Sequence, residues 1–258
     1  MSCIEPAGND THDTHPVSVK THMAHASERT REQAFSLIGT LDPEYRHRWE
    51  IVDGIVKRLS GPEARWLDGG CGTNLAVEEF PCALNVGLDA HCHPALRRNP
   101  GAFFVQGDLG RLPFRRGAFT LVTLNTVVEH LTEPTAVFRE IRRVLEPGGR
   151  LLIHTTNIRS PLILLGKLIP HRVRMALFTR LLGAGALDVF PAVHRANTPV
   201  ALSRIEGFAP EEFHAVQDMN WNNRVVFLFL LAWHLFTRLP GLWRLRTNLI
   251  VLLRKTEP

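Results

Sequence analysis

The chain has 258 residues, of which 45% are apolar and 21% are charged, and its formal net charge is +5. This length accommodates one sizeable α/β domain, and the composition is that of a globular protein, which excludes a largely disordered chain and one with many membrane spans. The basic residues are scattered and no nucleic-acid-binding motif accompanies them, so nucleic acid is not an expected partner.

The first 28 residues are polar and lack the apolar core of a signal peptide, so we expect a disordered tail, no export and a cytoplasmic location. Histidines in this tail raise the alternative of a metal site, but no second ligand cluster accompanies them, and no metal is expected. The cysteines form no C-x-x-C pair, so neither zinc nor a disulfide framework is indicated. These residues are His12, His15, His22 and His25, and Cys3, Cys71, Cys82 and Cys92.

Order is expected to begin at residue 43, with a helix that ends at Gly61 and Pro62. Short apolar runs typical of buried strands then alternate with helical segments. The expected strands are 64–68, 84–89, 102–108, 119–125 and 149–156, and the expected helices are 75–80, 93–99 and 133–145. Repeated strand-helix units predict an α/β fold with a doubly wound, mostly parallel sheet.

The alternation breaks after Thr156, where apolar helical pieces with several basic residues occupy about 157–197. We interpret this segment as a lid-like insertion after the fifth strand, and about 221–246 as a second insertion after the sixth. Between them we expect a helix over 198–208 and a strand over 213–220, and a seventh strand follows over 247–255. Residues 29–258 are therefore expected to form one domain.

The run Val225–Phe236 is apolar on all sides and is flanked by Arg224 and Arg238. Twelve residues are too few to span a bilayer comfortably, so the run is expected either to pack as core or lid, to lie on a membrane surface, or to contact another copy of the chain. With the first insertion, it favours a lipid, quinone, polyketide or aromatic ligand.

The segment Leu67–Asn74, LDGGCGTN, places a carboxylate at the end of an apolar strand and glycines in the turn that follows. Gly70 and Gly72 allow the backbone to approach a ligand closely, and the next helix would present free N–H groups there. The glycines alone are weak evidence for a nucleotide site.

Polar residues follow the next three strands as well. Asp89 ends the second strand, where an open sheet of this kind places an acid for ribose hydroxyls. Asp108 ends the third strand beside the apolar Leu109, a pair suited to an adenine ring and its amine. Asn125 ends the fourth strand, so four consecutive strands bring polar groups to one edge of the sheet.

As a set, these residues resemble a class I S-adenosylmethionine-dependent methyltransferase with a Rossmann-like sheet, closely over residues 62–156 and more loosely after them. The resemblance implies S-adenosylmethionine as cofactor and a small, apolar methyl acceptor as partner. The cofactor-binding residues that it implies are Asp68, Gly70, Cys71, Gly72, Asp89, Asp108, Leu109 and Asn125.

Two positions depart from the family pattern. Asn74 stands where the family has a third glycine, and Thr120 stands where the fourth strand usually carries an aspartate. These departures keep a second hypothesis open, a non-catalytic methyltransferase-like scaffold. A nicotinamide-dependent reductase is a weaker alternative, because the spacing G-x-G-x-N differs from its G-x-G-x-x-G motif.

Methyl transfer depends mainly on holding donor and acceptor in line, and a general base helps only for some acceptors. Histidines near the expected site are candidate bases or substrate-positioning groups, although each is also explained as a structural hydrogen-bonding residue. They are His130, His154 and His194. The sequence leaves the acceptor atom and the oligomeric state open.

Overall fold

The computed structural model describes residues 28–72, 80–91, 102–169, 192–220 and 223–257. Its helices are α1 (Glu28–Leu41), α2 (Arg48–Leu59), η3 (Val128–His130), α4 (Pro134–Val144), α5 (Pro161–Leu168), α7 (Pro199–Ser203), α8 (Arg224–Phe236) and η4 (Leu242–Leu245). Its strands are β1 (Gly61–Gly69), β2 (Cys82–Asp89), β3 (Phe103–Gln106), β4 (Phe119–Asn125), β5 (Leu145–Thr156), β6 (Phe208–Val216) and β7 (Asn248–Lys255).

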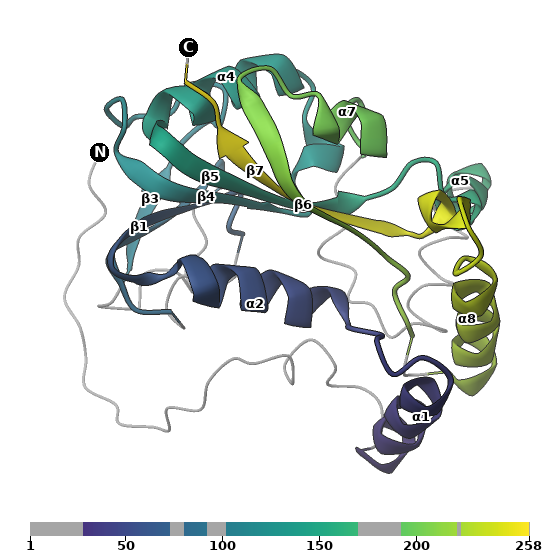
Figure 1. Cartoon of the computed structure of the whole chain (residues 1–258). Helices are drawn as coiled ribbons and strands as arrows, with labels where there is room; N and C mark the ends of the chain where they lie inside the picture. The colour runs from purple at the N-terminus through teal and green to yellow at the C-terminus, as the bar shows by residue number, and fades with distance from the viewer. Residues whose placement is uncertain (1–27, 73–79, 92–101, 170–191, 221–222, 258) are drawn as a thin grey trace.

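The strands form one seven-stranded sheet in the order β3-β2-β1-β4-β5-β7-β6. Strands β1 to β5 pair in parallel, and β7 is antiparallel to both of its neighbours. Helix α2 covers one face of the sheet, and α4 and α7 cover the other (Figure 1). The expected α/β class with a mostly parallel, doubly wound sheet is confirmed. The carboxyl ends of β1, β2, β3, β4 and β5 share one edge of it.

Each central strand is apolar on both faces because helices cover both. In β1, Trp66 packs toward α2, whereas Leu67 packs into the larger core beneath α4. The same alternation follows from the two-residue repeat of a strand in β5, where Leu152 faces α2 and Ile153 faces α4. Packing on both faces therefore fixes the positions of the strands and of the residues at their carboxyl ends.

Several expected boundaries were wrong, and two of them have a clear cause in the packing. Order begins before residue 43, because α1 packs Ala34 and Ile38 against Phe227 and Leu231 of α8. The sixth strand begins at Phe208 instead of residue 213, because Phe208 already pairs with Lys255 of β7.

The two expected insertions contribute α5, after β5, and α8 with η4, between β6 and β7. In Figure 1, α8 lies at one end of the molecule beside α1. The expected disordered tail and the expected helices at 75–80 and 93–99 lie outside the described residues, as do Cys3, Cys92 and the tail histidines.

The packing of α1 can be tested with two substitutions on the same helix. Ile38→Ala removes a side chain that is 2% exposed against α8, and should lower the free energy of unfolding by about 2–4 kcal/mol in urea titrations. Leu37→Ala, at a position 39% exposed, is the matched control and should cost less than about 1 kcal/mol. Equal effects of the two would contradict this packing.

Candidate functional site

A glycine turn follows β1 and is held by the neighbouring strand. The backbone N–H groups of Gly70 and Cys71 both donate to the Leu88 carbonyl, at 2.6 and 3.1 Å. Gly70 and Gly72 have φ values of +72° and +56°, a region that favours glycine. A Cβ atom on Gly70 would lie 2.5 Å from Val127, whereas one on Gly72 would have no atom of the described residues within 4 Å, apart from its own neighbours in the chain. The turn therefore offers close backbone approach at Gly72.

Asp89, at the end of β2, closes this turn from the side. One carboxylate oxygen accepts a hydrogen bond from the Gly72 N–H at 2.8 Å, and the other accepts one from the His91 N–H at 2.9 Å. The side chain is 16% exposed, and its Oδ1 also lies 3.7 Å from His91 Nδ1. A partly exposed carboxylate beside the glycine turn suits the two hydroxyls of a ribose, so this part of the site fits an adenosyl ligand.

Asp68 lies under the turn and is 3% exposed. Its Oδ1 accepts a hydrogen bond from the Thr123 hydroxyl at 2.6 Å, and that hydroxyl oxygen accepts one from the Trp66 indole N–H at 2.9 Å. Burial, opposed by the Thr123 hydrogen bond and supported by the nearby charge of Asp89, raises the pKa of the Asp68 carboxyl to about 6. The carboxylate is thus a fixed, buried group.

The third strand supplies a more exposed pair. Asp108 accepts a hydrogen bond from the Gly110 N–H at 2.8 Å, which closes the turn after the strand. Leu109 lies against the glycine turn, since a Cβ on Gly69 would be 2.8 Å from its Cδ2. Leu109 and the turn are therefore neighbours, as an adenine-binding role requires.

Asn125, at the end of β4, contacts His154 of β5, with 2.6 Å between Oδ1 and Nδ1. His154 is 1% exposed, and its Nε2 lies 3.2 Å from Asn248 Oδ1. Burial, helped by the charge of Arg48, lowers the pKa of His154 to about 3, so the ring is neutral near pH 7. Both ring nitrogens are occupied, which favours the structural explanation for His154 over a role as base.

A neutral imidazole donates one hydrogen bond and accepts one. The Asn248 Nδ2 group donates to Thr247 Oγ1 at 3.1 Å, which leaves Asn248 Oδ1 to accept from the His154 Nε2–H. The ring nitrogens thus contact the amides of both Asn125 and Asn248. His154 therefore holds the Asn125 side chain in place at the end of β4.

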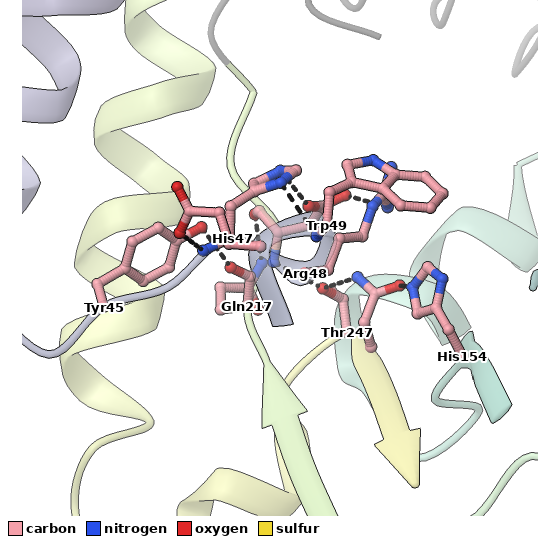
Figure 2. A network of polar contacts seen from close by, with 10 residues as sticks. Tyr45, His47, Arg48, Trp49, His154, Gln217 and Thr247 are labelled. Carbon is pink, nitrogen blue, oxygen red and sulfur yellow. Dashed lines mark hydrogen bonds and ion pairs between the residues drawn. The ribbon is translucent and has the colours of Figure 1, made fainter. Parts of the chain in front are cut away.

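A polar network beside His154 was not anticipated from the sequence (Figure 2). The Trp49 ring stands edge-on to His154 with 5.6 Å between centroids. Arg48 forms an ion pair with Asp218 at 2.5 Å, and His47 Nε2 lies 3.2 Å from the other Asp218 carboxylate oxygen. Although burial raises the pKa of the Asp218 carboxyl, Arg48 and His47 outweigh it and hold that pKa below its usual value. The only sequence signal was the motif RHRW at the start of α2.

The other two candidate histidines meet around Glu129. His130 ends η3, next to Glu129, and the backbone N–H of His194 donates to the Glu129 carbonyl at 2.9 Å. The buried Glu129 carboxylate accepts a hydrogen bond from the Thr155 hydroxyl at 2.6 Å. The structure therefore brings His130 and His194 to one place and His154 to another.

Three further positions bear on the expected site. Cys71 is buried, and burial raises the pKa of its thiol, so it is not a reactive thiolate. Thr120 bonds β1 to β4, because its Oγ1 accepts from the Arg65 N–H at 3.0 Å. Asn74 lies outside the described residues. Within the described ranges no group of three or more His, Cys, Asp or Glu side chains could hold a metal ion.

Residues 67–153 match the family model of a methyltransferase domain. The chain is 36% identical over 100 residues to a demethylmenaquinone methyltransferase of Beutenbergia cavernae, a match that covers 36% of this chain and 40% of that protein. It is 31% identical over 120 residues to a ubiquinone biosynthesis O-methyltransferase of Xanthomonas oryzae pv. oryzae, covering 43% and 50% of the two chains. The chain spans half or less of the length of these curated relatives.

Among solved structures, an S-adenosylmethionine-dependent methyltransferase from Mesorhizobium loti has a TM-score of 0.51 at 19% identity, over 81% of this chain and 97% of that chain. This likeness shows a shared fold. The matched segment 67–153 contains the glycine turn and the ends of β2, β3 and β4, and the family implies S-adenosylmethionine as the cofactor.

The burial of Asp68 predicts a pH-dependent cost to stability. Its carboxyl has a pKa of about 6 when folded against a usual 3.8, so the ionised form is destabilising in the folded state and the cost appears as pH rises. Asp68→Asn should therefore be more stable than the parent chain by about 1 kcal/mol at pH 4.5 and about 3 kcal/mol at pH 7.5.

Urea titrations at both pH values measure this difference. Asp108→Asn, which changes an exposed aspartate at the same edge, is the control for loss of a carboxylate outside the core. A gain for Asp68→Asn that does not grow with pH would contradict the buried ionised carboxylate.

Proposed function

We propose that the protein is an S-adenosylmethionine-dependent methyltransferase that methylates a small, apolar metabolite, on the premise that residues 67–153 match the family model of a methyltransferase domain. The observation that carries the proposal is the pairing of the open glycine turn at Gly72 with the Asp89 carboxylate. The lipid, quinone, polyketide and aromatic classes remain the proposed acceptors.

When bound, S-adenosylmethionine supplies a methyl group activated by its sulfonium. In our proposal, the Gly70–Gly72 turn approaches its methionine part and Asp89 accepts the two ribose hydroxyls. Leu109 then packs against the face of the adenine ring, and the Asp108 carboxylate accepts a hydrogen bond from the adenine amine. The protein contributes position and exclusion of water, which for in-line transfer supply on the order of 7–11 kcal/mol of barrier lowering.

The acceptor is proposed to enter at the carboxyl ends of β4 and β5. Asn125 lies at this edge, and its amide is fixed by the neutral His154. His130 and His194, which meet around Glu129, remain the candidate groups for moving a proton where the acceptor requires it. The names of two relatives, a demethylmenaquinone methyltransferase and a ubiquinone biosynthesis O-methyltransferase, support a quinone-like acceptor.

We further propose that α8 lets the enzyme rest on a membrane surface from the cytoplasmic side. One face of α8 packs on α1, while large apolar side chains on another face are exposed. These residues are Val225, Leu228, Phe229 and Phe236. Residues 219–256 contain no aspartate or glutamate, and Arg224 and Arg238 flank the helix, a charge pattern suited to anionic lipid.

In the described part of the chain, no helix is both long and apolar enough to cross a bilayer. The contact that we propose for α8 is a peripheral one. It would bring an apolar acceptor dissolved in the bilayer close to the enzyme.

Calorimetric titration tests the cofactor assignment. The parent chain should bind S-adenosylmethionine and not reduced nicotinamide dinucleotide. Asp89→Asn keeps an acceptor for the Gly72 N–H but loses charge-assisted bonds to ribose, so binding should weaken about 10- to 100-fold. Glu63→Gln, exposed at the opposite end of β1, is the control and should bind like the parent. Binding of the parent to the nicotinamide dinucleotide alone would refute the proposal.

Co-sedimentation with lipid vesicles tests the role of α8. The parent should bind vesicles of mixed phosphatidylcholine and phosphatidylglycerol more tightly than phosphatidylcholine alone, and added salt should weaken that binding. Replacing Leu228 and Phe229 together by serine should weaken it about tenfold or more. Val200→Ser, which alters an exposed apolar residue on α7, should change nothing, and equal losses in both variants would count against the α8 contact.

A further inference from the structure

A cavity of about 440 Å³ lies at the carboxyl end of β6, the edge strand farthest from β3. Its walls come from the α1–α2 connection, β6, α8 and the segment around η4. Four strands separate β6 from β2, which carries Asp89. The volume is in the range of small-molecule sites, and the cavity is not part of the glycine turn and its neighbours.

Arg246 is the unusual charge in this cavity. Its guanidinium donates to the Ala215 carbonyl at 3.0 Å and to Thr237 Oγ1 at 3.4 Å, which leaves further N–H groups for another acceptor. No carboxylate of the described residues forms an ion pair with it. Burial lowers the pKa of Arg246, and the charge of Arg238 adds to this shift, while the charge of Asp42 opposes it without reversing it.

The buried acid of the cavity wall, Asp42, acts on Arg246 from a distance and forms its own ion pairs elsewhere. Asp42 is buried and already paired twice, to His234 Nε2 at 2.8 Å and to Arg238 at 3.1 Å. Glu44 and Arg46 are both exposed, and their charges cancel. With Asp42 balancing Arg238, the cavity retains one net positive charge, that of Arg246.

Two buried acceptors in the cavity wall also lack hydrogen-bond donors. Gln217 is 1% exposed, and its Oε1 has no partner. His234 is 2% exposed, and because its Nε2 must carry the proton shared with the Asp42 carboxylate, the neutral ring leaves Nδ1 as an unpartnered acceptor. Burying polar atoms without partners is costly, so both residues favour a ligand with donor groups.

The remaining wall is aromatic. Tyr45 stands edge-on to His234, with 5.1 Å between centroids, and Phe213 stands edge-on to Trp243, at 5.6 Å. All four side chains line the cavity. Aromatic walls with a few convergent polar groups are typical of a site for a small organic molecule.

We propose that this cavity binds a small organic anion, in which a carboxylate or phosphate meets Arg246 and a hydroxyl or amine donates to Gln217 or His234. This inference goes beyond the proposed methyl transfer, because it requires neither the cofactor nor catalysis. Two kinds of ligand carry such an anionic group. One is the methyl acceptor itself, and the other is a separate ligand that is not methylated.

The probe for the test is 4-hydroxybenzoate, which carries a carboxylate, a hydroxyl donor and a ring, with 4-hydroxybenzamide as its uncharged counterpart. The parent chain should bind the carboxylate at least about tenfold more tightly than the amide, as read from Trp243-dependent fluorescence and calorimetry. Arg246→Met should weaken binding of the carboxylate by about tenfold or more and leave binding of the amide unchanged.

Arg244→Met is the matched control, because Arg244 stacks on the outside of Trp243, at 5.0 Å, and does not line this cavity. It should bind 4-hydroxybenzoate like the parent. Should Arg246→Met fail to fold, Arg246→Lys keeps the charge but loses the planar fork, and it should bind the probe with intermediate affinity.

Addition of labelled S-adenosylmethionine distinguishes the two sources. Methylation of the bound probe identifies the cavity as part of the acceptor site, and binding without methylation identifies a separate site; both support the proposal. Absence of saturable binding by 4-hydroxybenzoate and by inorganic phosphate, or equal affinity in the parent and Arg246→Met, would overturn it. Titration with S-adenosylmethionine alone, run in parallel, reports separately on the proposed methyltransferase activity.

Discussion

The arrangement at the sheet edge depends on one clamp, in which β2 holds the glycine turn that follows β1. The Leu88 carbonyl accepts the N–H groups of Gly70 and Cys71, and the Asp89 carboxylate accepts that of Gly72. These bonds extend the β1–β2 pairing past the end of the strand and require the positive φ angles of both glycines. A ligand carboxyl, amine or ribose therefore meets a turn whose shape is set before binding, which lowers the entropy cost of recognition.

At the same edge, the buried carboxylate of Asp68 lowers the stability of the fold, so stability does not explain why an acid lies there. Asp68 is buried and, near pH 7, mostly ionised, with Thr123 as its hydrogen-bond donor and the charge of Asp89 close by. Like charges in a region of low dielectric oppose folding. An uncharged residue would fill the position at lower cost, so retention of this carboxylate agrees with a role toward a cationic ligand group, such as an amine or a sulfonium.

The sequence predicted local features well and features made by distant segments poorly. Strand periodicity and the residues at strand ends, such as Asp89 and Asn125, follow from short-range patterns, because parallel strands bring their carboxyl ends to one edge. Helix α1 was missed, since its apolar face is short and is completed only by α8, nearly 200 residues away. The pairing of Arg48 with Asp218 likewise joins residues 170 positions apart, and no local pattern encodes it.

His154 shows how far a residue's chemistry depends on such distant contacts. A histidine at the end of β5 is a natural candidate base, but Trp49, Asn125 and Asn248 surround it and leave it neutral with both nitrogens occupied. From there the contacts run through Arg48 and Asp218 toward the β6 end of the sheet, where Gln217 borders the cavity. The cofactor edge and the cavity are thus supported by one fixed polar layer. An acceptor lying between them would be oriented by amide and guanidinium groups that do not titrate near pH 7, so positioning, and not proton transfer at His154, is the work that this layer can do.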